Sequence, residues 1–195
     1  MARKDTEQRI EDAAITLFSE KGYKGTSTRQ IAKEAGVSEL TVYRCYKTKE
    51  ELFRQALVNR APDEWLGNME PIPDRSLEEQ FTSLFERLCE TLMNRQDLIR
   101  IFYREGAAYP DIATLAKQVP PKIWGPIAEY IRKKAPSVSI ESSVGLALQI
   151  FGTYLGIILL STSFEDGFLP TPMKEFHASM AWTYACAIRD AGCSS

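Results

Sequence analysis

The most constraining feature of this sequence is the spacing of three small or apolar residues near its N-terminus. Ala32, Gly36 and Val42 are separated by four and then six positions. A helix-turn-helix needs a small residue where two helices approach, a glycine where the turn takes a left-handed backbone, and a branched apolar residue that holds the second helix. The spacing therefore predicts two short helices joined by a tight turn. An ordinary αα-hairpin has the same spacing and remains an alternative.

Apolar periodicity and capping residues predict four helices within the first sixty residues. Apolar side chains recur at helical spacing from Ile10 to Phe18, and Gly22 can take a left-handed conformation past the end of that helix. Residues suited to N-capping precede the next three helices: Ser27, Ser38 and Thr48. Four helices in so short a stretch indicate a compact module with its own core.

Prolines mark the boundary between this module and the rest of the chain. Pro62, Pro71 and Pro73 exclude one uninterrupted helix across the stretch that contains them. We therefore predict two domains, residues 1–60 and 61–195. Twelve basic and nine acidic residues give the first a net charge of +3, and the remaining twelve basic and seventeen acidic residues give the second a net charge of −5.

The larger domain also has helical periodicity along its length. We divide the stretch from Asp111 to Lys134 into two helices because it contains Pro120, Pro121 and Pro126. No segment shows sustained alternation of apolar and polar residues, which is typical of a half-buried strand. We therefore expect an all-α fold.

The composition excludes most metal sites and many enzyme classes. The chain has one histidine, His177, and four cysteines without a CxxC pair, whereas zinc fingers and zincin helices need at least two imidazoles. No glycine-rich phosphate loop is present, and the first residues lack the apolar region of a secretory signal. We expect no catalytic activity, no metal, no cofactor and a cytoplasmic location. His177 stays open as a catalytic base, a ligand contact, or a surface or hydrogen-bonded residue, and Cys45 as an oxidant sensor or a packed residue.

One segment resembles a known family. The run GYKGTSTRQIAKEAGVSELTVYRCYKTKEELFRQAL is similar to the DNA-binding domain of the TetR family of bacterial transcriptional regulators. Its marks are the IA-x-x-AGVS turn, the Thr-Val-Tyr-Arg helix and the K-x-K-E-E-L start of the next helix. The resemblance covers about residues 5–58 and departs from the family at Cys45, where histidine is common. It implies an N-terminal three-helix DNA-binding domain with a helix-turn-helix, followed by a larger helical domain for ligand binding and dimerisation.

The resemblance also implies which residues face DNA. The candidates lie on or beside the second, third and fourth helices: Thr28, Arg29, Ser38, Glu39, Leu40, Thr41, Tyr43, Arg44, Lys47 and Lys49. A guanidinium such as that of Arg44 can bind a guanine edge or a phosphate. Lys49 adds a cation to the free N–H groups of a helix start, an arrangement that binds phosphate. Glu39 is either solvated or accepts from a cytosine amine, and Lys47 faces either solvent or phosphate.

Aromatic residues of the larger domain form a candidate effector site. We expect an apolar cavity with Gln149 or Tyr154 as a polar group, although each aromatic side chain alone also suits a core. The candidate ligand-binding residues are Phe81, Phe85, Phe102, Tyr103, Trp124, Gln149, Phe151 and Tyr154. We expect a small, largely hydrophobic or aromatic molecule, neutral or cationic. Arg100 and Arg104 offer an alternative, a cavity that selects a carboxylate.

Ser142 to Phe164 is a run of 23 residues without charge, long enough to cross a bilayer. Its acidic flanks and seven polar residues disfavour a membrane span. A helix that is apolar all round also suits burial between its own domain and a second subunit. The resemblance implies that the last two helices form the homodimer interface, with these candidates: Gly145, Gly152, Gly156, Ala178, Ala181, Trp182 and Ala185.

Taken with the resemblance, the sequence predicts a homodimeric repressor. Two recognition helices would bind a double-stranded, palindromic operator, and a small molecule in the larger domain would release it. Two alternatives stay open: a DNA-binding architectural factor without a ligand, and an all-helical enzyme or carrier.

Overall fold

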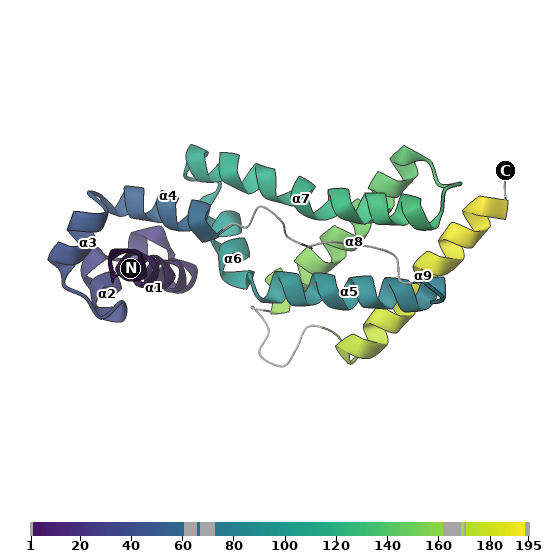
Figure 1. Cartoon of the computed structure of the whole chain (residues 1–195), viewed down its shortest axis with the longest axis horizontal. Helices are drawn as coiled ribbons and strands as arrows, with labels where there is room; N and C mark the ends of the chain where they lie inside the picture. The colour runs from purple at the N-terminus through teal and green to yellow at the C-terminus, as the bar shows by residue number, and fades with distance from the viewer. Residues whose placement is uncertain (1, 61–65, 67–72, 162–168, 170, 194–195) are drawn as a thin grey trace. The chain divides into compact units, whose positions relative to one another are not determined.

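Helices account for the regular structure of the chain. The computed structural model describes residues 2–60, 66, 73–161, 169 and 171–193 (Figure 1). These residues contain helices and no strand, so the predicted all-α fold is confirmed. The helices are α1 (Ala2–Gly25), α2 (Thr28–Glu34), α3 (Glu39–Cys45), α4 (Lys49–Arg60), α5 (Leu77–Met93), α6 (Gln96–Glu105), α7 (Pro110–Lys134), α8 (Ile140–Ser161) and α9 (Met173–Cys193).

The chain divides into two compact units that are not two continuous stretches of sequence. The first unit comprises Met1–Asp63 and Asp97–Val119, and the second comprises Glu64–Gln96 and Pro120–Ser195. The predicted boundary at residue 60 assigns residues 97–119 to the larger domain, whereas in the structure they pack with the N-terminal helices. The reason is that Leu98 and Ile101 of α6 are buried in the core of the first unit. No local sequence signal reports such a long-range contact.

The core of the first unit contains the residues that the helical periodicity selects. The stripe from Ile10 to Phe18 is buried, and the rings of Phe18 and Phe53 meet edge to face with centroids 4.7 Å apart. One carboxylate is buried among them. Glu11 accepts hydrogen bonds from the hydroxyl of Tyr46 at 2.6 Å and from the amide of Asn59 at 2.8 Å. Two donors compensate the loss of hydration of this carboxylate, so the polar group is compatible with an apolar core.

The predicted caps fix where the short helices begin. The side chains of Ser27 and Ser38 accept backbone N–H groups at the start of α2 and α3, and Thr48 Oγ1 accepts the N–H of Glu51 at 3.0 Å. Helices of seven residues form too few internal hydrogen bonds to persist alone. The caps and the core contacts therefore determine where they form.

The end of α1 is bonded to two other helices. Arg104 of α6 donates to the carbonyls of Phe18 and Ser19, and Glu105 accepts the N–H of Tyr23 at 3.0 Å. Lys49 of α4 donates to the carbonyl of Tyr23 at 2.8 Å and also to that of Thr26. These partners satisfy backbone groups that a helix end leaves without an internal bond.

Gly22 allows the backbone to kink at this end. Its φ is positive, as expected. A φ of 75° with a ψ of 168° is, however, an extended conformation that only glycine readily adopts, not the left-handed helical one. The helix continues after this kink as far as Gly25. A Cβ at Gly22 would lie 3.0 Å from Oε1 of Glu105. Conformation and space both require glycine here.

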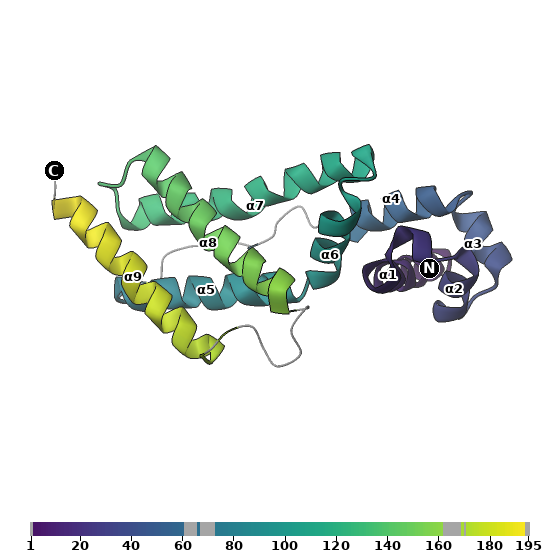
Figure 2. The same cartoon turned by 180° about the vertical axis from the view of Figure 1, so that it is seen from behind.

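In the second unit, α5 packs mainly against α9 and less extensively against α8 (Figures 1 and 2). The Ser76 side chain and the Glu79 carboxylate form a capping box at the start of α5. Two polar side chains are paired inside the unit, since the hydroxyl of Tyr130 donates to Oε1 of Gln80 at 3.1 Å. The rest of the core of the unit is mainly aliphatic and aromatic, and three further polar residues are buried in it: Thr91, Ser143 and His177.

The prediction of two helices between Asp111 and Lys134 was wrong. α7 is one helix that contains Pro120, Pro121 and Pro126. Proline lacks an N–H and removes one hydrogen bond, but its fixed φ is close to the helical value, so flanking turns can continue the helix. The division between the two units falls at this proline pair, between Val119 and Pro120.

We expect Gly22→Ala to lower the free energy of unfolding by about 1–3 kcal/mol, because alanine at this φ and ψ is strained and its Cβ meets Glu105. Thermal and urea denaturation measure the loss. Gly25→Ala is the matched control, since its φ is not positive and the nearest contact of an added Cβ is 3.4 Å. Equal stability of the two variants would contradict the assigned constraint.

Candidate nucleic-acid interface

The turn between α2 and α3 is held by an arginine from α1. Gly36 has a φ of 64°, the left-handed conformation that the sequence predicts. The guanidinium of Arg9 donates to the carbonyls of Ala35 and Gly36, and the N–H of Val37 donates to the carbonyl of Ala32 at 2.9 Å. A Cβ at Gly36 would lie 2.9 Å from the guanidinium. The turn thus has a fixed geometry, and the angle between the two helices follows from it.

α3 has one buried and one exposed side. Val42 is 1% exposed and Tyr46, just after the helix, is 7% exposed, as the sequence predicts. Leu40 and Tyr43 are 58% and 59% exposed, and Arg44 is also exposed. This short helix therefore presents an apolar side chain, a phenol and a guanidinium to its surroundings while its other side is fixed in the core.

Several predicted interface residues already make bonds within the chain. Ser38 accepts the N–H of Thr41 at 3.1 Å and shares a hydrogen bond with the Thr41 hydroxyl at 2.8 Å. Glu39 accepts a hydrogen bond from the Thr28 hydroxyl at 2.6 Å, which joins α2 to α3. These side chains order the start of α3. Lys47 differs, since it is exposed and lies 5.8 Å from the centre of the Tyr43 ring.

The structure gives Lys49 a role other than the expected phosphate contact. Its ammonium donates to the carbonyls of Tyr23 and Thr26 and lies 4.2 Å from the centre of the Tyr23 ring. An ammonium group has three donors, and two of them are used here. We therefore remove Lys49 from the candidate interface and assign it to the end of α1.

Sequence reasoning did not identify Arg9. It lies 26 residues before Ala35, and nothing in its local sequence differs from an exposed arginine on a helix. Thr28 was expected at the interface, but its bond to Glu39 was not foreseen. Long-range side-chain contacts of this kind follow from the packing of the helices, which sequence spacing does not report.

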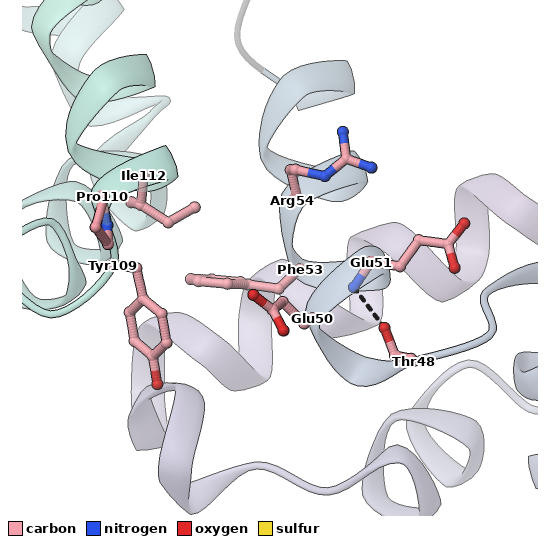
Figure 3. Close-up of a pocket in the computed structure, with 8 residues that line it drawn as sticks. All are labelled: Thr48, Glu50, Glu51, Phe53, Arg54, Tyr109, Pro110 and Ile112. Carbon is pink, nitrogen blue, oxygen red and sulfur yellow. Dashed lines mark hydrogen bonds between the residues drawn. The ribbon is translucent and has the colours of Figure 1, made fainter.

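A pocket lies elsewhere in the first unit, between α4 and the start of α7 (Figure 3). Its volume is about 400 Å³, and its lining residues are Thr48, Glu50, Glu51, Phe53, Arg54, Tyr109, Pro110 and Ile112. Phe53 extends toward Tyr109, with ring centroids 6.1 Å apart. Three of the eight lining residues are charged, Glu50, Glu51 and Arg54, whereas a small-molecule site typically has few polar groups.

Three residues predicted to bind a ligand lie together in the second unit. The ring centroid of Phe85 lies 5.8 Å from that of Phe81 and 5.7 Å from that of Tyr154. Phe151 is buried in the same unit, and Trp124 is partly exposed on α7. Phe81 and Phe85, with Tyr154 as the polar group, remain candidates for an enclosed site.

The other candidates do not line an enclosed site. Tyr103 is 77% exposed on α6, and Gln149 is exposed on α8. Phe102 packs against the core of the first unit. Leu98 and Ile101 occupy the inward side of α6, so the neighbouring Tyr103 points outward.

The residues predicted for a dimer interface divide into two groups. Gly152, Ala178 and Trp182 are exposed on α8 and α9, and Gly145 and Gly156 are partly exposed. The prediction was wrong for two alanines of α9 that are 0% exposed, because they face α5 within their own unit: Ala181 and Ala185.

Among the described residues, one helix is apolar and long enough for a bilayer by composition alone, α8, with a mean hydropathy of 1.9. Its inward side, including Ala147 and Ile150, is buried in the second unit. This arrangement is typical of a core helix. Within the described part of the chain, no three His, Cys, Asp or Glu side chains gather as a possible metal site.

Comparison with known proteins places the helix-turn-helix in a family. A family model described as bacterial regulatory proteins, tetR family, matches residues 10–56. YvkB of Bacillus subtilis strain 168, an uncharacterized HTH-type transcriptional regulator, is 31% identical over 127 residues, 65% of this chain and 66% of that protein. IcaR of Staphylococcus epidermidis, a negative transcriptional regulator of the biofilm operon icaADBC, is 45% identical over 51 residues, 26% of this chain and 28% of that protein. The chain thus spans just under two thirds of the first relative and less than a third of the second.

Solved structures share the fold over nearly the whole chain. A TetR-family regulator from Mesorhizobium loti has a TM-score of 0.72 and 22% identity, covering 96% of this chain and 98% of that one. A regulator from Saccharomonospora viridis, solved in complex with choline, has a TM-score of 0.70 and 20% identity, covering 93% and 95%. The match of the family model to α1–α4 and the relatives that share it lead to one conclusion: the chain belongs to the TetR family of bacterial transcriptional regulators.

Proposed function

We propose that this protein is a homodimeric, cytoplasmic repressor that binds a palindromic DNA operator through α3 and releases it when a small, largely apolar molecule binds in the second unit. The observation that carries the proposal is the exposed side of α3, which stands on a turn fixed by Arg9. IcaR, a relative over the helix-turn-helix, is named as a negative regulator, which supports repression. We assign the protein no enzymatic activity.

The exposed side chains suit different parts of a DNA duplex. The guanidinium of Arg44 can form two hydrogen bonds with a guanine in the major groove, and Leu40 can contact a thymine methyl group. Tyr43 and the nearby Lys47 suit phosphates on either side of the groove. Arg29, exposed on α2, adds a further cation for the backbone. Ser38, Glu39 and Thr41 act mainly through the bonds that order α3.

Exposed apolar side chains on α8 and α9 support dimerisation. Trp182 is 62% exposed on α9, and Leu148 and Leu160 are also exposed on α8. Large exposed apolar residues on adjacent helices are typical of surfaces that a partner covers. A second copy of this chain is the simplest partner, because a palindromic operator needs two recognition helices related by twofold symmetry.

The second unit supports an apolar effector. Its interior contains the ring cluster of Phe81, Phe85 and Tyr154, and such walls suit an aromatic or aliphatic molecule. The alternative of a carboxylate held by Arg104 is disfavoured, because that guanidinium donates to the carbonyls at the end of α1. The related structure that contains choline is an example of a small organic molecule bound by a protein of this fold.

Selection of duplexes from a random-sequence pool by the purified full-length protein tests the proposal. We expect enrichment of inverted repeats whose half-sites lie about one helical turn, or a multiple of it, apart. Arg44→Ala should then weaken binding to the selected duplex roughly 10- to 100-fold, from the loss of one base or phosphate contact. Arg132→Ala, an exposed arginine on α7, is the control. Selection of no sequence, or equal loss in both variants, would contradict the proposal.

Two lysines near the start of α4 should respond differently to the same substitution. Lys47→Met should keep the stability of the wild type and reduce the slope of log affinity against log salt by about 1, as expected for one lost phosphate contact. Lys49→Met should lower the free energy of unfolding by about 1–3 kcal/mol, because two carbonyls lose a charged donor. The reverse pattern would return the phosphate role to Lys49.

We expect Gly152→Leu to weaken the dimer without unfolding the subunit. An added Cβ at Gly152 meets nothing within 4 Å in the single chain, so only a partner copy would be displaced. Analytical ultracentrifugation at micromolar concentration measures the change, and Gly125→Leu is the control, with equally open space at its Cβ. A monomeric wild type, or an unchanged dimer in the variant, would show that the partner does not cover this face.

A further inference from the structure

Two buried polar groups in the second unit have no partner within the described part of the chain. Tyr154 of α8 is 0% exposed and His177 of α9 is 4% exposed, and their ring centroids lie 5.5 Å apart. Neither the hydroxyl of Tyr154 nor Nε2 of His177 has a hydrogen-bond partner among the described residues. Both atoms are thus buried and unpaired, on rings that lie next to each other.

Two other buried tyrosines are paired. The hydroxyl of Tyr46 donates to Glu11 at 2.6 Å, and that of Tyr130 donates to Gln80 at 3.1 Å. A buried polar group without a partner lowers stability, and most such groups in folded proteins have one. Two neighbouring exceptions in one core indicate a partner from outside the chain.

The groups around this pair are mainly aromatic. The ring centroid of Tyr154 lies 5.7 Å from that of Phe85 and 6.2 Å from that of Phe176. Tyr184 continues the cluster, with its ring centroid 5.8 Å from that of Phe85. A molecule that reaches the two polar atoms therefore meets ring faces and edges, which favour another aromatic ring.

Both polar groups are uncharged at neutral pH. Burial lowers the pKa of His177 although the Glu86 carboxylate acts in the opposite direction, and burial raises the pKa of Tyr154. The negative charge of Glu86 disfavours an anion nearby. A hydroxyl group fits, because its oxygen can accept the proton of the Tyr154 hydroxyl and still bond to the imidazole.

We propose that Tyr154 and His177 bind the hydroxyl group of an uncharged aromatic molecule inside the second unit. This inference rests on the proposed function, since it names the chemistry of the effector. It differs from the general expectation of an apolar ligand because it requires one hydroxyl group and assigns the two residues that bind it.

Matched pairs of probes that differ by a hydroxyl or a methyl group test the proposal. Isothermal calorimetry with the full-length protein would compare phenol with toluene and 2-naphthol with 2-methylnaphthalene. We expect one of the hydroxyl compounds to bind about tenfold more tightly than its methyl counterpart, as one added hydrogen bond implies. Tyr154→Phe should remove this preference. Tyr184→Phe, which removes a hydroxyl from the same cluster, should keep it.

A measurement without any ligand gives a second test. Tyr154→Phe should keep or raise the thermal midpoint, because the deleted hydroxyl has no partner, whereas Tyr130→Phe should lower it by deleting a bond to Gln80. A lower midpoint for Tyr154→Phe would show that the hydroxyl is paired in the free protein, for instance by a buried water. That result, equal binding of both members of each probe pair, or no binding of either hydroxyl compound up to its solubility would overturn the proposal.

DNA binding separates this inference from the proposed function. If the hydroxyl probe binds through Tyr154 and weakens binding to the selected duplex, the result supports both the hydroxyl site and the proposed function. If it binds through Tyr154 and leaves DNA affinity unchanged, the site stands and ligand-controlled repression fails. If no duplex is selected, the proposed function fails, and the probe pairs still decide the site.

Discussion

The hydrogen bonds around the end of α1 hold the first unit together. A helix that ends against a core leaves backbone groups that must find partners, and here those partners come from two other helices. Arg104 of α6 bonds to Phe18 and Ser19, and Glu105 of α6 and Lys49 of α4 both bond to Tyr23. Gly22 lies between these bonded groups, and an added Cβ there would lie 3.0 Å from Oε1 of Glu105. One helix end thus determines how α1, α4 and α6 are joined.

The same bonds explain why the unit that contains the helix-turn-helix includes a segment from the middle of the chain. α6 buries Leu98 and Ile101 in the same core and adds a bond from the Ser19 hydroxyl to Asp97 at 3.0 Å. A signal that displaces α6 would act directly on the end of α1. From there, Arg9 on α1 reaches the turn before α3. The first unit therefore has a set of bonds that leads from α6 through α1 to the turn before α3.

Local features of the fold were predictable from the sequence, and features that depend on distant contacts were not. The caps at Ser27 and Ser38 and the positive φ of Gly36 depend on neighbouring residues, so spacing sufficed to predict them. The bonds of Lys49 depend on residues more than twenty positions away, and its predicted role changed. Proline content gave the wrong result for α7, since each ring removes one hydrogen bond but is compatible with helical φ.

In the candidate sites, residue type was more predictable than orientation. The aromatic residues of the larger domain were recognised as a group, but which of them face inward depends on how each helix is turned. Tyr103 and Gln149 face outward, whereas Tyr154 faces the core. His177 was left open in the sequence because a single imidazole on a helix has no informative pattern. Its burial beside Tyr154 distinguishes it, and the two come together because α8 and α9 both pack against α5.

Around α3, some residues bond within the subunit and others project outward, and this separation has an evolutionary consequence. Ser38 and Glu39 hold the helix in place through bonds to Thr41 and Thr28, while Leu40 projects outward. Substitution of an outward residue removes few contacts within the subunit, so most changes there cost little stability. Gene duplicates of such a protein can therefore acquire new operator sequences one residue at a time while the fold stays intact.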